Sequence, residues 1–139
     1  MGLFTIFDVA GSAMSAQSVR LNTTASNMAN ADSVSSSVGE TYRARHPVFQ
    51  TALRDSFAAR NDPVAGVRVA GIVESNAPAR REYQPGHPAA DAEGYIYRPN
   101  VSMVEEMANM MSAQRSYQMN TEVANAAKQL FIRTLSLGQ

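Results

Sequence analysis

The sequence predicts a mainly α-helical fold, in which long N- and C-terminal helices pack as a coiled-coil-like pair beside a small β element. Two observations carry this prediction. Apolar residues recur every seven positions near both ends of the chain, as in helices that share a seam. Short alternating runs, separated by Pro and Gly, occupy the middle. The expected division is a helical terminal part, residues 1–32 and 101–139, and a β and loop insert, residues 33–100.

A first helix is expected over residues 2–30. Its seven-residue spacing is set by large apolar side chains, namely Phe7, Met14, Leu21 and Met28. Between Met1 and Asp32 the charged side chains are Asp8, Arg20 and Asp32, and the other polar positions carry Ser, Thr, Asn and Gln. A helix with one face in water normally carries Lys, Arg and Glu there. We therefore expect this helix to be buried against other chains.

The middle of the chain is expected to hold two or three short strands. Residues 33–39 are rich in Ser and predict a loop, and residues 51–66 show no clear period and predict a linker. Strand character occurs in three runs, residues 42–49, 67–74 and 95–98. Pro47 interrupts the first run, and Gly71 indicates a bulge in the second. Residues 78–88 are rich in Pro and Gly and predict turns.

The last helix is expected over residues 101–137. Ser102 and Glu105 form a capping box at its start, and Gly138 is a stop signal at its end. Its apolar stripe comprises Met103, Met107, Met110, Tyr117, Ala124 and Phe131, and Ala113, Ala127 and Leu135 widen it. Such a stripe is most often ordinary packing within one chain. Because the first helix is poor in charge, we interpret both stripes as candidate assembly contacts.

Composition argues against several classes of function. The formal net charge is zero, so no basic surface is available to hold a nucleic-acid backbone. Cysteine is absent, which excludes disulfides and thiolate metal sites. No apolar run reaches the length of about 18 residues that a transmembrane helix needs. The N-terminal segment lacks the pattern of a cleaved signal peptide, so export would use a route that cleaves no signal.

Residues with catalytic or ligand chemistry form no recognisable site. His46 and His87 are each followed by Pro and have no spaced partner ligand, which argues against a metal site. Glu105 and Glu106 are adjacent, so on a helix they point about 100° apart and cannot face each other as a catalytic pair. The chain contains no Gly-x-Ser-x-Gly elbow and no glycine-rich phosphate loop. We predict no catalytic residue, cofactor or small-molecule substrate.

Residues 25–33 read Ala-Ser-Asn-Met-Ala-Asn-Ala-Asp-Ser and resemble the signature of bacterial flagellar rod and hook proteins. The signature positions are Ser26, Asn27, Ala29 and Asn30. Collinear similarity continues through further segments, residues 7–14, 42–44, 74–75 with 77–78, 94–95 with 99–101, and 105–107 with 112–117. The length and the absence of a large insert favour a subunit of the proximal rod. Another axial subunit such as FlgB is the alternative within the family, and a monomeric helical module that binds a partner helix is the alternative outside it.

The resemblance implies a structural subunit without enzymatic activity. Members of this family pass unfolded through the flagellar type III export apparatus and polymerise helically into the rod, the driveshaft that spans the periplasm and serves motility. The implied neighbours are FlgB, FlgF, FlgG, FliE and further copies of the chain. Terminal helices would form the inner layer and the β element would lie outside. From the residues alone, Asn27 and Asn30 are either contacts between subunits or helix-end caps, with the cap favoured for Asn30.

Overall fold

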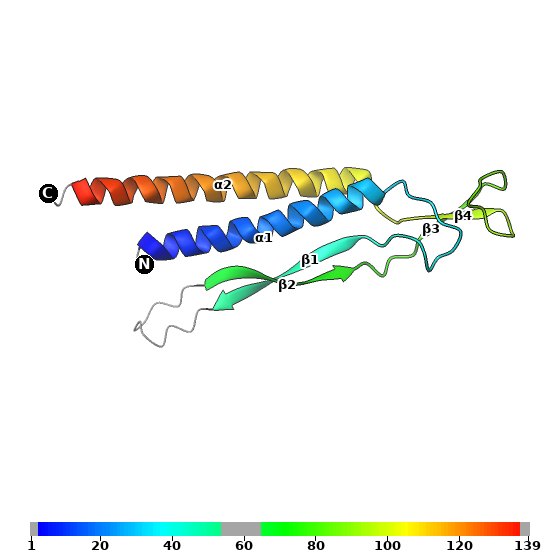
Figure 1. Ribbon diagram of the computed structural model, residues 1–139, viewed down its shortest axis with the longest axis horizontal. Coiled ribbons are helices and arrows are strands. Elements are labelled where there is room, and N and C mark those ends of the chain that lie inside the picture. Colours follow the sequence, from blue (N-terminus) through cyan, green and yellow to red (C-terminus); the bar gives the residue numbers. More distant parts are fainter. Residues whose placement is uncertain (1–2, 54–64, 137–139) are drawn as a thin grey trace.

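The computed structural model describes residues 3–53 and 65–136 (Figure 1). Its elements in chain order are α1 (Leu3–Asn30), β1 (Arg45–Leu53), β2 (Ala65–Glu74), β3 (Arg80–Tyr83), β4 (Tyr95–Arg98) and α2 (Met103–Ser136). The molecule is elongated, with α2 along one side of α1 and the β1–β2 hairpin along another (Figure 1). The small β3–β4 sheet lies beyond the C-terminal end of α1 (Figure 1).

The expected long terminal helices are both present, and they run antiparallel (Figure 1). α1 contacts α2, β1 and β2, whereas in the described part of the chain α2 packs against α1 alone. The first helix is therefore the central layer of three. The low charge of α1 has a cause within the chain, since the chain's own elements cover two of its sides. From the sequence we expected other chains to cover this helix.

Both helix ends that join the insert are capped by their own side chains. The Glu105 N–H donates to Ser102 Oγ over 3.4 Å, which confirms the Ser102 half of the predicted capping box. At the end of α1, Asn30 Nδ2 donates to the Ser26 carbonyl over 2.8 Å, and Ser33 Oγ donates to the Asn30 carbonyl over 2.8 Å. The Ser33 bond pairs the Asn30 carbonyl, one of the last four carbonyls that a helix leaves without a partner, whereas the Ser26 carbonyl also accepts within the helix. In this structure the side chain and the carbonyl of Asn30 both make hydrogen bonds at the end of α1.

β1 and β2 form an antiparallel hairpin in which Arg45 lies opposite Glu74. The register shifts between Val48 and Phe49, and the extra residue on β2 directly precedes Gly71, which confirms a bulge at the predicted place. Pro47 lies inside β1 rather than ending it. A two-stranded sheet has only edge strands, and an edge strand can accommodate a residue without an N–H donor.

The predicted linker over residues 51–66 is wrong at both ends. Residues 51–53 continue β1, and residues 65–66 begin β2. Both ends pair with each other, with Leu53 opposite Ala65, and this pairing extends the strands although the sequence there shows no alternation. The centre of the predicted linker, residues 54–64, lies outside the described residues.

The expectation of two or three strands is also wrong, because the described residues hold four strands in two separate antiparallel pairs. The missed strand is β3, which lies in the stretch predicted as turns. Every residue of β3 is exposed, so the sequence offers no alternation of buried and exposed positions there. Its partner β4 also pairs with the first loop, since Ser35 and Tyr97 exchange two backbone hydrogen bonds of 3.0 Å.

Asp91 organises the turn between β3 and β4. Its Oδ1 accepts the N–H groups of Tyr95 over 2.8 Å and Glu93 over 2.9 Å, and the Tyr97 hydroxyl donates to Oδ2 over 3.2 Å. These hydrogen bonds, led by that of the Tyr95 N–H, lower the pKa of Asp91 below its ordinary value, although burial acts in the opposite direction. The turn closes at Gly94, whose φ of 83° is a left-handed conformation that favours glycine.

Candidate assembly surfaces

The contact between α1 and α2 is made mainly by small and polar side chains. On α2 the buried residues are Glu106, Ala113 and Ala127. Two hydrogen bonds cross between the helices: Arg20 Nη2 donates to Asn109 Oδ1 over 3.1 Å, and Thr121 Oγ1 donates to Met14 Sδ over 3.4 Å. Alanine removes little apolar area from water, so this contact supplies little hydrophobic stabilisation for a helix of 34 residues.

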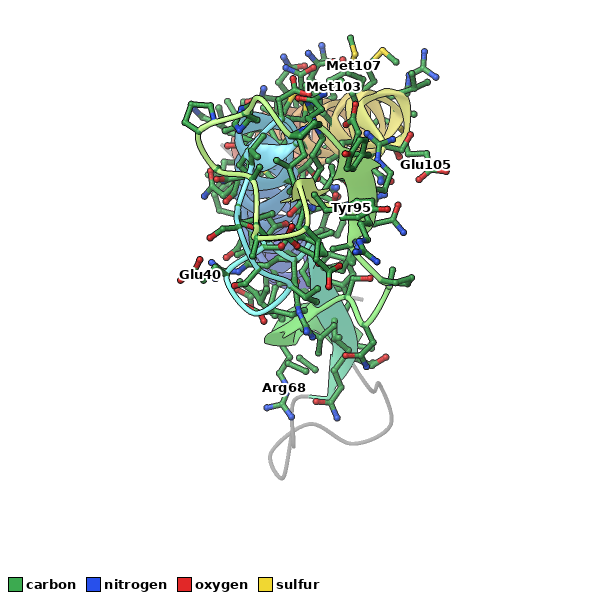
Figure 2. All side chains as sticks on the ribbon, turned by 90° about the vertical axis from the view of Figure 1, so that its right-hand side faces the viewer. Glu40, Arg68, Tyr95, Met103, Glu105 and Met107 are labelled. Atoms are coloured by element: carbon green, nitrogen blue, oxygen red, sulfur yellow. The ribbon has the colours of Figure 1, made fainter. Side chains whose placement is uncertain are left out.

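The large apolar side chains of α2 are exposed instead. Val104 is 77% and Met111 is 64% exposed, and the set extends along the whole helix: Met103, Val104, Met107, Met111, Tyr117, Met119, Val123, Leu130, Phe131, Ile132 and Leu135. Met103 and Met107 project at one extreme of the molecule, and Arg68 of the hairpin projects at the opposite extreme (Figure 2). Large apolar side chains exposed along a whole helix are typical of a surface that contacts a partner.

The predicted stripes lie at the borders of the contact between the helices. On α1 all four predicted residues are half-buried: Phe7, Met14, Leu21 and Met28. On α2, Met110 and Ala124 are half-buried, and the others are exposed: Met103, Met107, Tyr117 and Phe131. The buried positions of α2 keep the seven-residue spacing but occur three residues later than Met103, Met110 and Ala124. Contact of either stripe with another subunit stays a prediction.

The signature residue Asn27 joins α1 to the start of β1. It is 1% exposed. Its Nδ2 donates to the Arg45 carbonyl over 2.9 Å, and its Oδ1 accepts the Arg45 N–H over 2.8 Å. The Tyr42 hydroxyl also donates to Oδ1 over 2.9 Å and lies 3.3 Å from Ser26 Oγ. Of the signature residues, Ser26, Asn27 and Asn30 therefore have partners within the chain, whereas Ala29 is exposed.

A second contact fixes the other end of the hairpin to α1. The Val67 N–H donates to Ser12 Oγ over 3.1 Å, and Ser12 Oγ donates to the Val9 carbonyl over 2.8 Å. The backbone approaches so closely that a Cβ at Gly66 would lie 2.9 Å from Ser12 Oγ. Sequence reasoning missed this pair, because neither residue belongs to an apolar stripe and nothing in their spacing links them.

One face of α1 is covered neither by α2 nor by the hairpin. Its exposed residues recur every seven positions: Asp8, Ser15, Asn22 and Ala29. Ala25 is exposed beside them, and a Cβ added at Gly11 would meet no atom within 4 Å. After Asp8 this face carries no charge within the helix. Cover by the chain's own elements therefore does not account for all of the low charge of α1.

The described residues show no arrangement for other chemistry. Within residues 3–53 and 65–136, no group of three or more His, Cys, Asp and Glu side chains could hold a metal ion. His46 lies in β1, and His87 lies in the turn region after β3, where its Nδ1 accepts the Ala89 N–H over 3.1 Å. Among the described helices, none is long and apolar enough to cross a membrane.

Two segments of the chain, one around each terminal helix, match families of proteins that build the same kind of structure. Residues 7–35 match the family described as flagella basal body rod protein, and residues 92–137 match the family described as flagellar basal body rod FlgEFG protein C-terminal. An elongated chain with paired terminal helices and outward apolar side chains is thus of the flagellar basal-body rod class.

Full-length relatives refine this assignment. The FlgC rod protein of Yersinia enterocolitica is 55% identical over 139 residues and that of Salmonella typhimurium 53% over 139 residues, each covering 100% of both chains. The FlgC protein of Borreliella burgdorferi is 33% identical over 151 residues, covering 100% of this chain and 99% of its own. The chain belongs to the FlgC family of flagellar basal-body rod proteins, and it is a structural subunit of the rod.

Proposed function

We propose that this rod subunit assembles into the proximal rod through its helical part, residues 1–32 and 101–139, and that the insert, residues 33–100, lies outside. One observation carries the proposal. Among the described helices and strands α2 packs only on α1, yet most of its large apolar side chains are exposed. Each Å² of apolar surface removed from water contributes about 25 cal/mol. A shaft needs many modest contacts that repeat along its length, and this surface offers them.

The proposed neighbours and the route of export follow from the family to which the chain belongs. The partners of the α2 surface are the axial subunits FlgB, FlgF, FlgG and FliE and further copies of this chain, in a seam of coiled-coil type. Transit through the type III export apparatus requires an unfolded chain and involves no cleaved signal. The chain has no cysteine, and its helices meet through alanine and polar residues, so little packing opposes unfolding.

A double substitution, Val104→Asp with Met111→Asp, tests the proposal. Both side chains are more than half exposed, so the circular dichroism of the purified chain should not change. Burying two carboxylates without partners is strongly unfavourable, so incorporation into basal bodies and swimming should be lost in cells that lack the native chain.

The matched control is Ser112→Asp with Thr134→Asp, which adds the same charges at exposed polar positions of α2 that are turned by about 100° or more from Met111 around the helix axis. This variant should be incorporated and should support swimming. Normal rods built from the Val104→Asp, Met111→Asp chain would defeat the proposal.

A further inference from the structure

We infer that the outer face of α2 in one copy of the chain packs against the open face of α1 in the next copy. The outer face of α2 is defined by Val104, Met107, Met111, Gln114 and Gln118. The open face of α1 is defined by Gly11, Ser15, Ser18, Asn22, Ala25 and Ala29. This inference rests on the proposed function, because it names the partner surface that covers α2 in the rod.

The two faces complement each other in size. Residues on both faces are spaced alternately by three and four positions, the spacing that lets two helices share a seam. The α2 face presents long, adaptable side chains such as Met107 and Met111, whereas the α1 face presents none larger than Asn22. Gly11 has open space above its Cα, so a neighbouring helix can approach the backbone closely there.

Charge does not oppose the contact. Neither face carries a charge over the residues that define it. Beyond those residues the α1 face continues to Asp8, and the α2 face continues to Glu122, about five turns from Val104, and to Lys128. The N-terminal end of α1 and the C-terminal part of α2 lie toward the same end of the molecule (Figure 1). Because α2 carries both signs there, charge does not select the orientation of neighbouring copies.

The direction of the helices and the symmetry of the contact both indicate that a second copy of the chain covers the outer face of α2. Within the chain, α2 covers a different face of α1, so the two faces defined above do not meet inside one molecule. When copies share one orientation, α2 of one is antiparallel to α1 of the next, as within the chain (Figure 1). A contact between two different surfaces propagates from copy to copy, whereas a contact between identical surfaces closes into a dimer.

Disulfide cross-linking in purified basal bodies tests the inference, since the native chain has no cysteine. Asn22→Cys is combined in turn with Met111→Cys, Gln114→Cys or Gln118→Cys, and copper phenanthroline with oxygen takes the two electrons and two protons that disulfide formation releases. At least one pair should give a ladder of linked chains that collapses on reduction. The matched control pairs Asn22→Cys with Ser112→Cys, an exposed position turned about 100° from Met111 around the helix axis, and should give at least about tenfold less product.

Each outcome bears on the inference separately from the proposed function. Motile cells whose rods contain all three double variants, but show no linked chains, would overturn the inference and leave the proposed function intact. Linked chains from Asn22→Cys alone would indicate a contact between identical faces and would also overturn it. A photo-cross-link from position 22 to a different rod protein would replace the second copy as the occupant.

A second variant tests the inference if the cysteine variants are not incorporated into basal bodies. An added Cβ at Gly11 would meet no atom within 4 Å outside the neighbouring backbone of its own helix. We therefore expect Gly11→Leu to retain the helical circular dichroism of the single chain. It should nevertheless reduce incorporation into basal bodies at least about tenfold, whereas Gly11→Ala should retain it, since only the longer side chain blocks a close helix. Normal incorporation of Gly11→Leu would contradict the inference.

Discussion

Asn27 shows at the residue scale how a rod-family signature can serve the fold of a single subunit. Its amide donates to the carbonyl and accepts from the N–H of the same residue, Arg45, as a neighbouring β-strand would. A buried backbone must have all its polar groups paired, and Asn carries a donor and an acceptor at the required reach. From the sequence, Asn27 could contact another subunit. In the structure, its amide group has hydrogen-bond partners within the chain.

The first prediction concerns this amide. Asn27→Ala should lower the free energy of unfolding by about 1–3 kcal/mol, because it leaves the N–H and C=O of Arg45 without their partner. Urea unfolding followed by circular dichroism measures this loss. Asn22→Ala, at an exposed position of the same helix, should change the free energy by less than about 0.5 kcal/mol. Equal losses for the two variants would mean that the Asn27 bonds do not hold the hairpin.

At the scale of elements, the second prediction concerns the close approach of β2 to α1. Gly66→Ala should destabilise the chain by about 1 kcal/mol, because the new methyl group would meet Ser12 Oγ at 2.9 Å and turn this hydroxyl away from the Val67 N–H. Gly71→Ala is the matched control in the same strand, since a Cβ there meets no atom within 4 Å. Thermal unfolding compares the two variants, and a Gly66→Ala chain as stable as Gly71→Ala would show that the strand tolerates displacement from the helix.

Elements with strong local patterns were predictable and those without were not. Both helices follow from seven-residue periodicity and, for α2, from the Ser102 cap. β3 has no buried face, and its pairing with β4 depends on the Asp91 turn, which no short-range pattern reveals. The main stripe predicted on α2 lies three residues before the buried positions, because the prediction ranked large apolar side chains first, although Ala113 and Ala127 were expected to widen it. The centre of the contact instead holds Ala113 and Ala127, where small residues let the helices approach closely.

At the scale of the whole molecule, the three-layer arrangement explains why the sequence accounted for only part of the low charge of α1. The hairpin that covers α1 is held by Asn27 at one end and Ser12 at the other, and contacts between such distant positions leave no periodic trace. The remaining open face is uncharged between Gly11 and Ala29. Low charge on α1 therefore has two physical origins, namely cover by the chain's own strands and an open face suited to another helix.

The last prediction follows from the same layering. α1 is covered on two sides, whereas α2 is held by one side that buries only alanine and one glutamate, so α2 should open more often in the dilute free chain. Hydrogen exchange by mass spectrometry should show protection in residues 123–136 at least about tenfold below that in residues 10–27, an opening free energy lower by about 1.4 kcal/mol. In assembled basal bodies this difference should disappear, because neighbours cover the apolar side chains of α2. Equal protection of both helices in the free chain would show that α1 alone suffices to fold α2, as expected of a monomeric module rather than of a subunit completed by its neighbours.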